Sequence, residues 1–300
     1  MRAVSYNIQW GCGRDGVVDL ARVTRTIADA DIIALQEVER NWKPEHGDEA
    51  AILSSLLPKH HWTYIASVDL DGSTVAPDGT VTTQRRQYGQ MTLSRWPISS
   101  VRSWSLSKYP VYGQINDQSV VLETVVECPG HHLRVYNTHL NYLMQDQRMR
   151  QVEELRRIVE QAPRQGPVVS APGVDPIHLN EDWLAMDTGR LPTMPDSAIL
   201  MGDFNMRVNS PEYRRMVGSE DPTYGRGSPS AEHFADSMVV AGHPVEEGCT
   251  YPDFARDEFK RIDYCFLSFD LIPHVRRSWI DADADASDHQ PVWTELEIGA

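Results

Sequence analysis

Short apolar runs that stop at a polar residue are the feature that most limits the fold of this chain. The run Ile32–Leu35 ends in Gln36-Glu37, and the run Ala198–Gly202 is followed at once by Asp203. Apolar runs of about four to eight residues, bounded by turn residues, are typical of buried strands. A charged side chain at the end of such a strand must be paired, hydrogen-bonded or bound to a metal ion. We therefore expect buried sheets whose strand ends carry function.

Helical patterns lie between these strands. Leu20, Val23 and Ile27 recur at three- and four-residue spacing, and similar patterns predict helices over Ala50–Leu57, around Met149–Ile158 and over Pro211–Val217. Further strands are predicted at 3–8, 62–68, 88–93, 98–106, 120–126 and 133–138, with a β-rich section over 259–298. Because strands largely follow strands, the order favours packed sheets flanked by helices over a doubly wound sheet. The sequence predicts one α/β (α+β) domain over residues 1–300.

Two long stretches are predicted to be loops. Residues 69–86 are rich in Gly, Asp and Thr, and residues 163–195 hold six prolines with little periodicity. Loops of such length in compact domains are usually functional or mobile. The part at about 170–195, which includes His178, Trp183 and Met186, is interpreted as an insertion. A lid, an oligomer contact and a disordered loop all stay open for it.

The charge balance bears on the class of partner. The chain has 28 Lys and Arg against 43 Asp and Glu, a formal net charge of −15. A negative field opposes the approach of a long polyanion, which disfavours extended nucleic acid as substrate. No run of apolar residues is long enough to span a membrane, and the four cysteines form no regular pattern. We expect a cytoplasmic protein without a stable membrane anchor or disulfide framework.

Eight polar residues lie at or near the ends of predicted strands. Strand ends on one edge of a sheet converge in space, so these carboxylates, amides and imidazoles are expected to form one site. Oxygen-rich ligand sets suit hard divalent cations, so the pattern indicates Mg²⁺ or Mn²⁺, as one or two ions. The residues are Asn7, Glu37, His139, Asp203, Asn205, Asp263, Asp288 and His289.

A series of motifs resembles the endonuclease/exonuclease/phosphatase superfamily, which includes deoxyribonuclease I, abasic-site endonucleases, neutral sphingomyelinases and inositol polyphosphate 5-phosphatases. The resemblance spans about residues 2 to 298, and the motifs at 202–205 and 287–289 are the most specific. It implies a deoxyribonuclease I-like, four-layered sandwich of two packed mixed sheets flanked by helices. In chain order, the motifs are SYNI at 5–8, LQEV at 35–38, LSRWPI at 93–98, NTHL at 137–140, GDFN at 202–205, RIDY at 261–264 and SDH at 287–289.

The resemblance implies a cation site and a water site. Glu37, with Asn7 nearby, is similar to the main Mg²⁺ site of the family, where the cation polarises phosphoryl oxygens. Asp288 resembles a further metal ligand or a support of the site. Asp203 is expected to position or deprotonate the attacking water, and Asn205 to hold a phosphate oxygen or a second metal.

The resemblance also implies roles in proton transfer. His289 is expected to contact the phosphate or transfer a proton, oriented by Asp263 through its other ring nitrogen. His139 matches a second family histidine and is a candidate acid for the leaving group.

Some positions are less distinctive or depart from the family. Arg86, or its neighbour Arg85, is a candidate to grip a phosphate, although a solvated loop charge explains either equally well. Arg148 is interpreted as an exposed charge of its helix. Gln9 stands where bacterial relatives often carry His, and Asp117-Gln118-Ser119 replaces a stretch in which many relatives carry Arg. The second departure removes an expected cation near the substrate.

These observations predict a divalent-metal-dependent hydrolase of a phosphate ester. A phosphodiesterase acting on a small-molecule or lipid-headgroup diester is favoured. The alternative is a Mg²⁺-dependent nuclease acting on DNA or RNA, because a local basic cleft can bind nucleic acid on an acidic protein. A phosphomonoesterase and a non-catalytic binding protein are the less favoured interpretations. The oligomeric state is left open.

Overall fold

A computed structural model describes the chain except residues 171–172, 174, 180–190, 220, 222, 224–229 and 299–300. Most of the stretch interpreted as an insertion, including Trp183 and Met186, thus lies outside the described residues. Within that stretch the structure places a short helix, α4 (Pro176–Leu179). In the described part of the chain, no helix is both long and apolar enough to cross a membrane. The four cysteines are free thiols.

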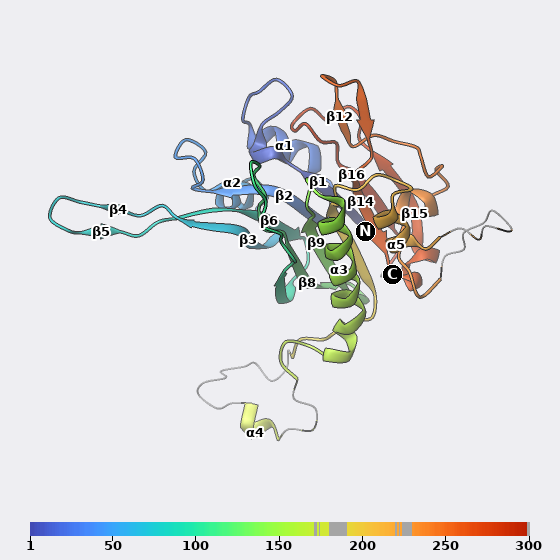
Figure 1. Cartoon of the computed structure of the whole chain (residues 1–300). Helices are drawn as coiled ribbons and strands as arrows, with labels where there is room; N and C mark the ends of the chain where they lie inside the picture. The colour runs from blue at the N-terminus through green and yellow to red at the C-terminus, as the bar shows by residue number, and fades with distance from the viewer. Residues whose placement is uncertain are drawn as a thin grey trace.

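Two six-stranded mixed sheets form the centre of the fold (Figure 1). In the first, only β1 and β2 run parallel. Its strands, in spatial order, are β15 (Val275–Ile280), β16 (Val292–Leu296), β1 (Arg2–Asn7), β2 (Ile32–Arg40), β6 (Arg85–Ser94) and β3 (His61–Asp71). In the second, only β9 and β10 run parallel. Its strands are β11 (Ala235–Asp236), β14 (Asp263–Leu267), β10 (Ala198–Asp203), β9 (His131–His139), β8 (Val120–Cys128) and β7 (Ile98–Ser105).

Helices and two small ribbons complete the structure. The ribbons pair β12 (Tyr251–Asp253) with β13 (Glu258–Lys260), and β4 (Thr74–Val75) with β5 (Val81–Thr82). The remaining helices are α1 (Leu20–Ile27), α2 (Glu49–Leu56), α3 (Gln145–Gln165), α5 (Pro211–Val217) and α6 (Ser237–Val240). Two 3-10 turns lie at Gln9–Gly11 and Phe269–His274.

The sheets pack face to face and carry helices on their outer faces. Ala34 of β2 and Ile199 of β10 belong to one buried cluster between the sheets. Ile33, the next residue of β2, packs with α1 and α2 on the outer side of the first sheet. Leu200 of β10 packs with Leu155 of α3 on the outer side of the second sheet. Both faces of β2 and β10 are buried, which explains the apolar runs Ile32–Leu35 and Ala198–Gly202. The predicted four-layered sandwich is confirmed.

The interpretation of residues 69–86 as a loop is wrong. Strand β3 continues to Asp71, β6 already begins at Arg85, and the β4–β5 ribbon lies between them. The resulting hairpin projects from the body of the molecule, at the left in Figure 1. Val75 and Val81 are 68% and 57% exposed. A ribbon that buries neither face has no need of an apolar alternation, so its sequence lacks the usual strand signal.

The loop predicted from Pro163 also begins too early, because α3 continues through Gln165 with Pro163 inside its last turn. Proline has no N–H to donate to the carbonyl four residues earlier, which normally destabilises a helix. Here that carbonyl, on Val159, accepts a hydrogen bond of 2.7 Å from Nη1 of Arg134. The buried Arg134 side chain replaces the missing donor, so the helix continues past the proline.

Strand pairing brings the predicted site residues together. Asp203 of β10 pairs with His139 of β9 on one side and with Asp263 of β14 on the other. Residues paired across neighbouring strands point to the same face of the sheet, so these three side chains form one row. In the facing sheet, Asn7 ends β1 and pairs with Gln36 of β2. The polar ends of the parallel pairs β1–β2 and β9–β10 therefore lie close together.

Candidate active site

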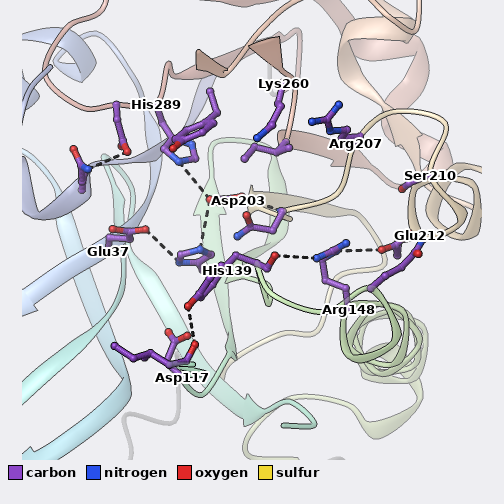
Figure 2. Close-up of a pocket in the computed structure, with 18 of the residues that line it drawn as sticks. Glu37, Asp117, His139, Arg148, Asp203, Arg207, Ser210, Glu212, Lys260 and His289 are labelled. Atoms are coloured by element: carbon purple, nitrogen blue, oxygen red, sulfur yellow. Dashed lines mark hydrogen bonds and ion pairs between the residues drawn. The ribbon is translucent and has the colours of Figure 1, made fainter. Parts of the chain in front are cut away.

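An open cleft of about 980 Å³ lies at these strand ends (Figure 2). Six of the residues expected in the site line it: Glu37, His139, Asp203, Asn205, Asp288 and His289. Asn7 and Asp263 lie behind this lining, and each is hydrogen-bonded to a lining residue. The residues that the motifs singled out thus form a single group in space.

Asp203 lies at the centre of the group and is 1% exposed. Its Oδ1 accepts a hydrogen bond of 2.9 Å from the backbone N–H of Asn205, and its Oδ2 accepts one of 3.1 Å from Nδ2 of Asn7. The preceding Gly202 lets β10 approach β9 closely, because a Cβ at this position would lie only 2.0 Å from the carbonyl oxygen of Thr138. The glycine of the GDFN motif thereby sets the distance between Asp203 and the end of β9.

Two imidazoles face the same carboxylate oxygen. Nε2 of His139 lies 3.5 Å from Oδ2 of Asp203, and Nε2 of His289 lies 3.7 Å from that atom. Figure 2 shows the two rings approaching Asp203 from opposite sides. Nδ1 of His139 lies 4.0 Å from Oε1 of Glu37. Asp203 is therefore placed between two groups that can donate or accept a proton.

His289 is held by a second carboxylate. Its Nδ1 lies 2.8 Å from Oδ2 of Asp263, and both side chains are buried. Burial by itself lowers the pKa of His289, but the charges of Asp263 and Asp203 outweigh this effect and raise the pKa above its usual value. Burial raises the pKa of Asp263, against the opposing effect of the His289 charge. The pair thus favours a positively charged His289 whose Nε2 is directed toward Asp203.

Carboxylates also gather on the other side of the cleft. Oε1 of Glu37 accepts a hydrogen bond of 2.9 Å from Nδ2 of Asn7, and Oδ2 of Asp288 accepts one of 2.9 Å from Nε2 of Gln9. Burial raises the pKa of Asp288. The charge of His289 opposes this increase, and the nearby charge of Glu37 adds to it. Glu37 has a φ of +60° at a bulge of β2, a backbone conformation that turns its side chain out of the regular alternation. Such crowding of acids calls for a cation.

The donor set fits a hard divalent cation. Glu37, Asp203 and Asp288 offer carboxylate oxygens to the cleft, the ligands that Mg²⁺ and Mn²⁺ prefer. Asp203, Asp263 and His289 also have potential ligand atoms within 4.8 Å of one another. Asn7 presents its amide nitrogen to Glu37 and Asp203, while its oxygen accepts from the backbone N–H of Gln9. In this arrangement Asn7 holds two carboxylates together, while its amide oxygen is engaged by the backbone of Gln9.

Two expected substrate contacts differ in position. Asn205, with a φ of +50°, lines the cleft and donates from Nδ2 to the carbonyl of Leu140 at 3.0 Å. Arg86 does not line the cleft: its Nε donates to the carbonyl of Trp42, and its guanidinium stacks 5.1 Å from the centroid of the Trp42 ring. Its neighbour Arg85 is paired with Asp69 on the hairpin. The structure therefore brings Asn205 into the site and leaves Arg86 outside it.

Arg148 was not expected in the site, and its interpretation as an exposed charge is wrong. Its side chain is 14% exposed, lines the cleft and lies 3.1 Å from Oε1 of the fully buried Glu212. The guanidinium also donates to the carbonyl of Asn141. Helical periodicity places Arg148 on a polar face, but it gives no sign of a partner 64 residues later in the chain. The sequence contains no short-range signal for this contact.

Other cleft residues come from loops and from the β12–β13 ribbon. Arg207, Arg256 and Lys260 form a cationic side, and Lys260 stands directly before the RIDY motif, a proximity that could have drawn attention to it. Asp117 adds a further acid to the lining of the cleft. Gln9, noted only as a departure, positions Asp288.

Comparison with known proteins identifies the family of the chain. Residues 4–289 match the Endonuclease/Exonuclease/phosphatase family. No curated protein matches the sequence significantly. An endonuclease/exonuclease/phosphatase from Beutenbergia cavernae is similar in structure, with a TM-score of 0.60 and 22% identity over 100% of this chain and 72% of that one.

Two further solved structures are similar at low identity. A mannosyl-6-phosphatase from Bacteroides thetaiotaomicron has a TM-score of 0.61 and 16% identity, covering 99% of this chain and 100% of the other. Truncated TDP2 from Caenorhabditis elegans has a TM-score of 0.60 and 16% identity, covering 98% and 96%. At such identity these likenesses show the fold, whereas the sequence match over nearly the whole chain shows the family. The chain belongs to the endonuclease/exonuclease/phosphatase family of divalent-metal-dependent enzymes and is a phosphoric ester hydrolase.

Proposed function

We propose that the chain is a phosphodiesterase that hydrolyses a small-molecule or lipid-headgroup phosphodiester. The observation that carries this proposal is the charge of the cleft. In the described part of the chain, each Lys or Arg that lines the cleft is ion-paired with an acid. The pairs are Arg148 with Glu212 at 3.1 Å, Arg207 and Lys260 with Glu258 at 2.9 and 2.7 Å, and Arg256 with Asp253 at 3.8 Å.

Neutralised cations favour a substrate with little charge. A phosphodiester carries one negative charge, whereas a monoester near neutral pH approaches two. A nucleic acid carries a charge at each phosphate and relies on unpaired Lys and Arg along its path. With its cations paired and a net charge of −15 on the whole chain, the protein supports a single diester better than either alternative.

The cleft also offers apolar contact to an organic substituent. Trp10, Tyr88, Ile115 and Tyr142 line it, and Ile115 and Tyr142 are 81% and 53% exposed. The Tyr142 hydroxyl donates to the backbone carbonyl of Ile115 at 2.7 Å, so the Tyr142 side chain is tied to the segment that carries Ile115. An alcohol or headgroup attached to the phosphate would find apolar contact there.

The site residues provide the proton transfers of the reaction. Asp203 takes a proton from the attacking water, whose oxygen forms the new bond to phosphorus in line with the ester oxygen that leaves. His139 supplies a proton to that leaving oxygen, and the charged His289 binds a non-bridging oxygen of the phosphate. A divalent cation held by Glu37 and Asp288 would neutralise charge that develops on the phosphoryl oxygens. Asp263 acts through His289 as a positioning residue.

A substrate comparison tests the proposal. The purified chain is assayed with Mn²⁺ on bis-p-nitrophenyl phosphate, p-nitrophenyl phosphate, glycerophosphocholine and plasmid DNA, beside the Asp203→Asn variant. We expect kcat/KM for the diester to exceed that for the monoester by about tenfold or more, equivalent to about 1.4 kcal/mol. Cleavage of DNA or of the monoester in preference to both small diesters would contradict the proposal.

Glu258 offers a matched control of the charge argument. Replacement by Gln leaves Arg207 and Lys260 without their acidic partner and lies outside the group around Asp203. The Glu258→Gln variant should gain activity on the monoester relative to the diester. An unchanged ratio would show that the pairing of cations does not set the preference.

A further inference from the structure

A second cluster of potential metal ligands lies outside the cleft. It consists of Glu39 near the end of β2, His46 in the following loop and Glu49, the first residue of α2. One ligand atom from each residue lies within 4.8 Å of the ligand atoms of the other two. All three are absent from the lining of the cleft that holds Glu37. The cluster is therefore separate from the proposed catalytic site.

The contacts within the cluster are short and the side chains are well covered. Oε2 of Glu39 lies 2.8 Å from Nδ1 of His46, whose side chain is 10% exposed. Oε2 of Glu49 accepts a hydrogen bond of 2.7 Å from the backbone N–H of Glu39. Glu39 and Glu49 are 2% and 0% exposed. Two carboxylates and one imidazole are thus buried close together, with little access to solvent.

The second carboxylate oxygen of Glu49 has no partner among the described residues. Oε1 is buried and has no hydrogen-bond partner. A buried carboxylate oxygen without a partner is costly, and the neighbouring carboxylate of Glu39 adds repulsion. A cation bound between the three side chains would satisfy this oxygen and remove the repulsion in one step.

We propose that Glu39, His46 and Glu49 bind a transition-metal ion of the Zn²⁺ class at a site distinct from the catalytic one. Two carboxylates and one imidazole are a ligand set that Zn²⁺ accepts, with water in the fourth position. The imidazole disfavours Mg²⁺, which prefers oxygen ligands and keeps several of its waters. The two sites therefore differ in the class of cation that they select.

The position of the ligands indicates a structural role for this ion. The ion would join the end of β2 to the start of α2 across residues 41–48. Nζ of Lys43 in this loop lies 4.8 Å from the centroid of the Trp10 ring, and Trp10 lines the cleft. An ion at Glu39 thus fixes a loop that supports one wall of the active site without entering the reaction.

Metal titration tests the site without measuring activity. The background is the Glu37→Gln/Asp288→Asn variant, which lacks the two carboxylates proposed to hold the catalytic cation, freed of metal by a chelator. It is titrated with Co²⁺, followed by visible absorption, and with Zn²⁺ in competition with a chromophoric chelator. We expect one bound equivalent, displacement of Co²⁺ by Zn²⁺, and a rise in Tm on binding.

Three further substitutions in this background locate the ion. His46→Ala and Glu49→Gln should each lose the bound equivalent and the Tm rise, while circular dichroism in chelator confirms that both are folded. Glu45→Gln, at an exposed position of the same loop, should retain both. Equal binding in the background and in His46→Ala, or no bound equivalent in the background, would overturn the proposal. Because no step depends on turnover, such a failure is distinct from failure of the proposed phosphodiesterase.

Discussion

Nδ1 of His289 lies 2.8 Å from Oδ2 of Asp263, and its Nε2 faces Oδ2 of Asp203 at 3.7 Å. The buried Asp263 thereby fixes both the orientation and the charge of the ring. Strand pairing places Asp263 beside Asp203, so the sheet itself provides this alignment. A carboxylate that holds one nitrogen of an imidazole leaves the other free for substrate.

Replacing Asp263 by Asn tests this alignment at nearly constant volume. Without the carboxylate the pKa of His289 falls, since the charge of Asp263 is the largest contribution that raises it. We expect kcat to decrease by about 10²- to 10⁴-fold. The alkaline limb of the pH–rate profile should move to lower pH, because the ring loses its proton earlier. Asp283→Asn, on an exposed loop, is the control, and an unshifted limb in Asp263→Asn would argue against the assigned role.

Arg148 and Glu212 should be coupled in stability. Glu212 is fully buried, so Arg148→Met leaves a buried carboxylate whose other side-chain contact is with Gln145. We expect a loss of about 3–5 kcal/mol in the free energy of unfolding. Urea denaturation should show that the Arg148→Met/Glu212→Gln double variant is more stable than Arg148→Met alone. The coupling would be refuted if the loss in unfolding free energy of the double variant equalled the sum of the losses in Arg148→Met and Glu212→Gln.

Gly202→Ala should disrupt the contact between the two central strands of the second sheet. The added Cβ would lie 2.0 Å from the backbone oxygen of Thr138, and backbone cannot move aside as a flexible side chain can. We expect a loss of more than about 4 kcal/mol in unfolding free energy, beyond the common range for point substitutions. Gly79→Ala, where a Cβ meets open space, should cost only about 1 kcal/mol through its positive φ.

Glu49 makes stability depend on pH in the metal-free protein. Burial raises its pKa from 4.5 to about 8, so the folded state holds a proton that the unfolded chain releases. The associated stability is present below the unfolded pKa and is lost as the pH rises toward about 8. In chelator, Glu49→Gln should therefore gain stability relative to the unsubstituted chain between about pH 5 and about pH 8. A difference in unfolding free energy that stays constant across this window would contradict the shift.

The sequence predicts the site well where the chemistry lies in the strands themselves. Asp203 ends a strand whose unbroken apolar run identifies it as buried, and His139 ends the parallel strand beside it. The β3–β6 hairpin was missed because an exposed ribbon needs no apolar face, as Val75 and Val81 show. Apolar periodicity in a sequence arises from burial, so an exposed strand leaves no such pattern to detect.

Contacts between distant segments explain the other differences. Arg148 is drawn into the cleft by Glu212, and the helix turn at Pro163 is retained by Arg134. Neither partner is close in sequence, so local periodicity cannot anticipate either contact. Arg86 shows the reverse case, because its stacking on Trp42 takes a plausible phosphate ligand away from the site.

The most direct test of the central claim is the steady-state hydrolysis of bis-p-nitrophenyl phosphate by the unsubstituted chain and by Asp203→Asn, each with Mn²⁺ and with chelator. The central claim is that Asp203 accepts a proton from the attacking water in a metal-dependent phosphodiesterase site. We predict turnover that requires the metal and a decrease in kcat of about 10³-fold or more in the variant, with a smaller change in KM. Equal turnover by the two proteins, or turnover that persists in chelator, would contradict the account.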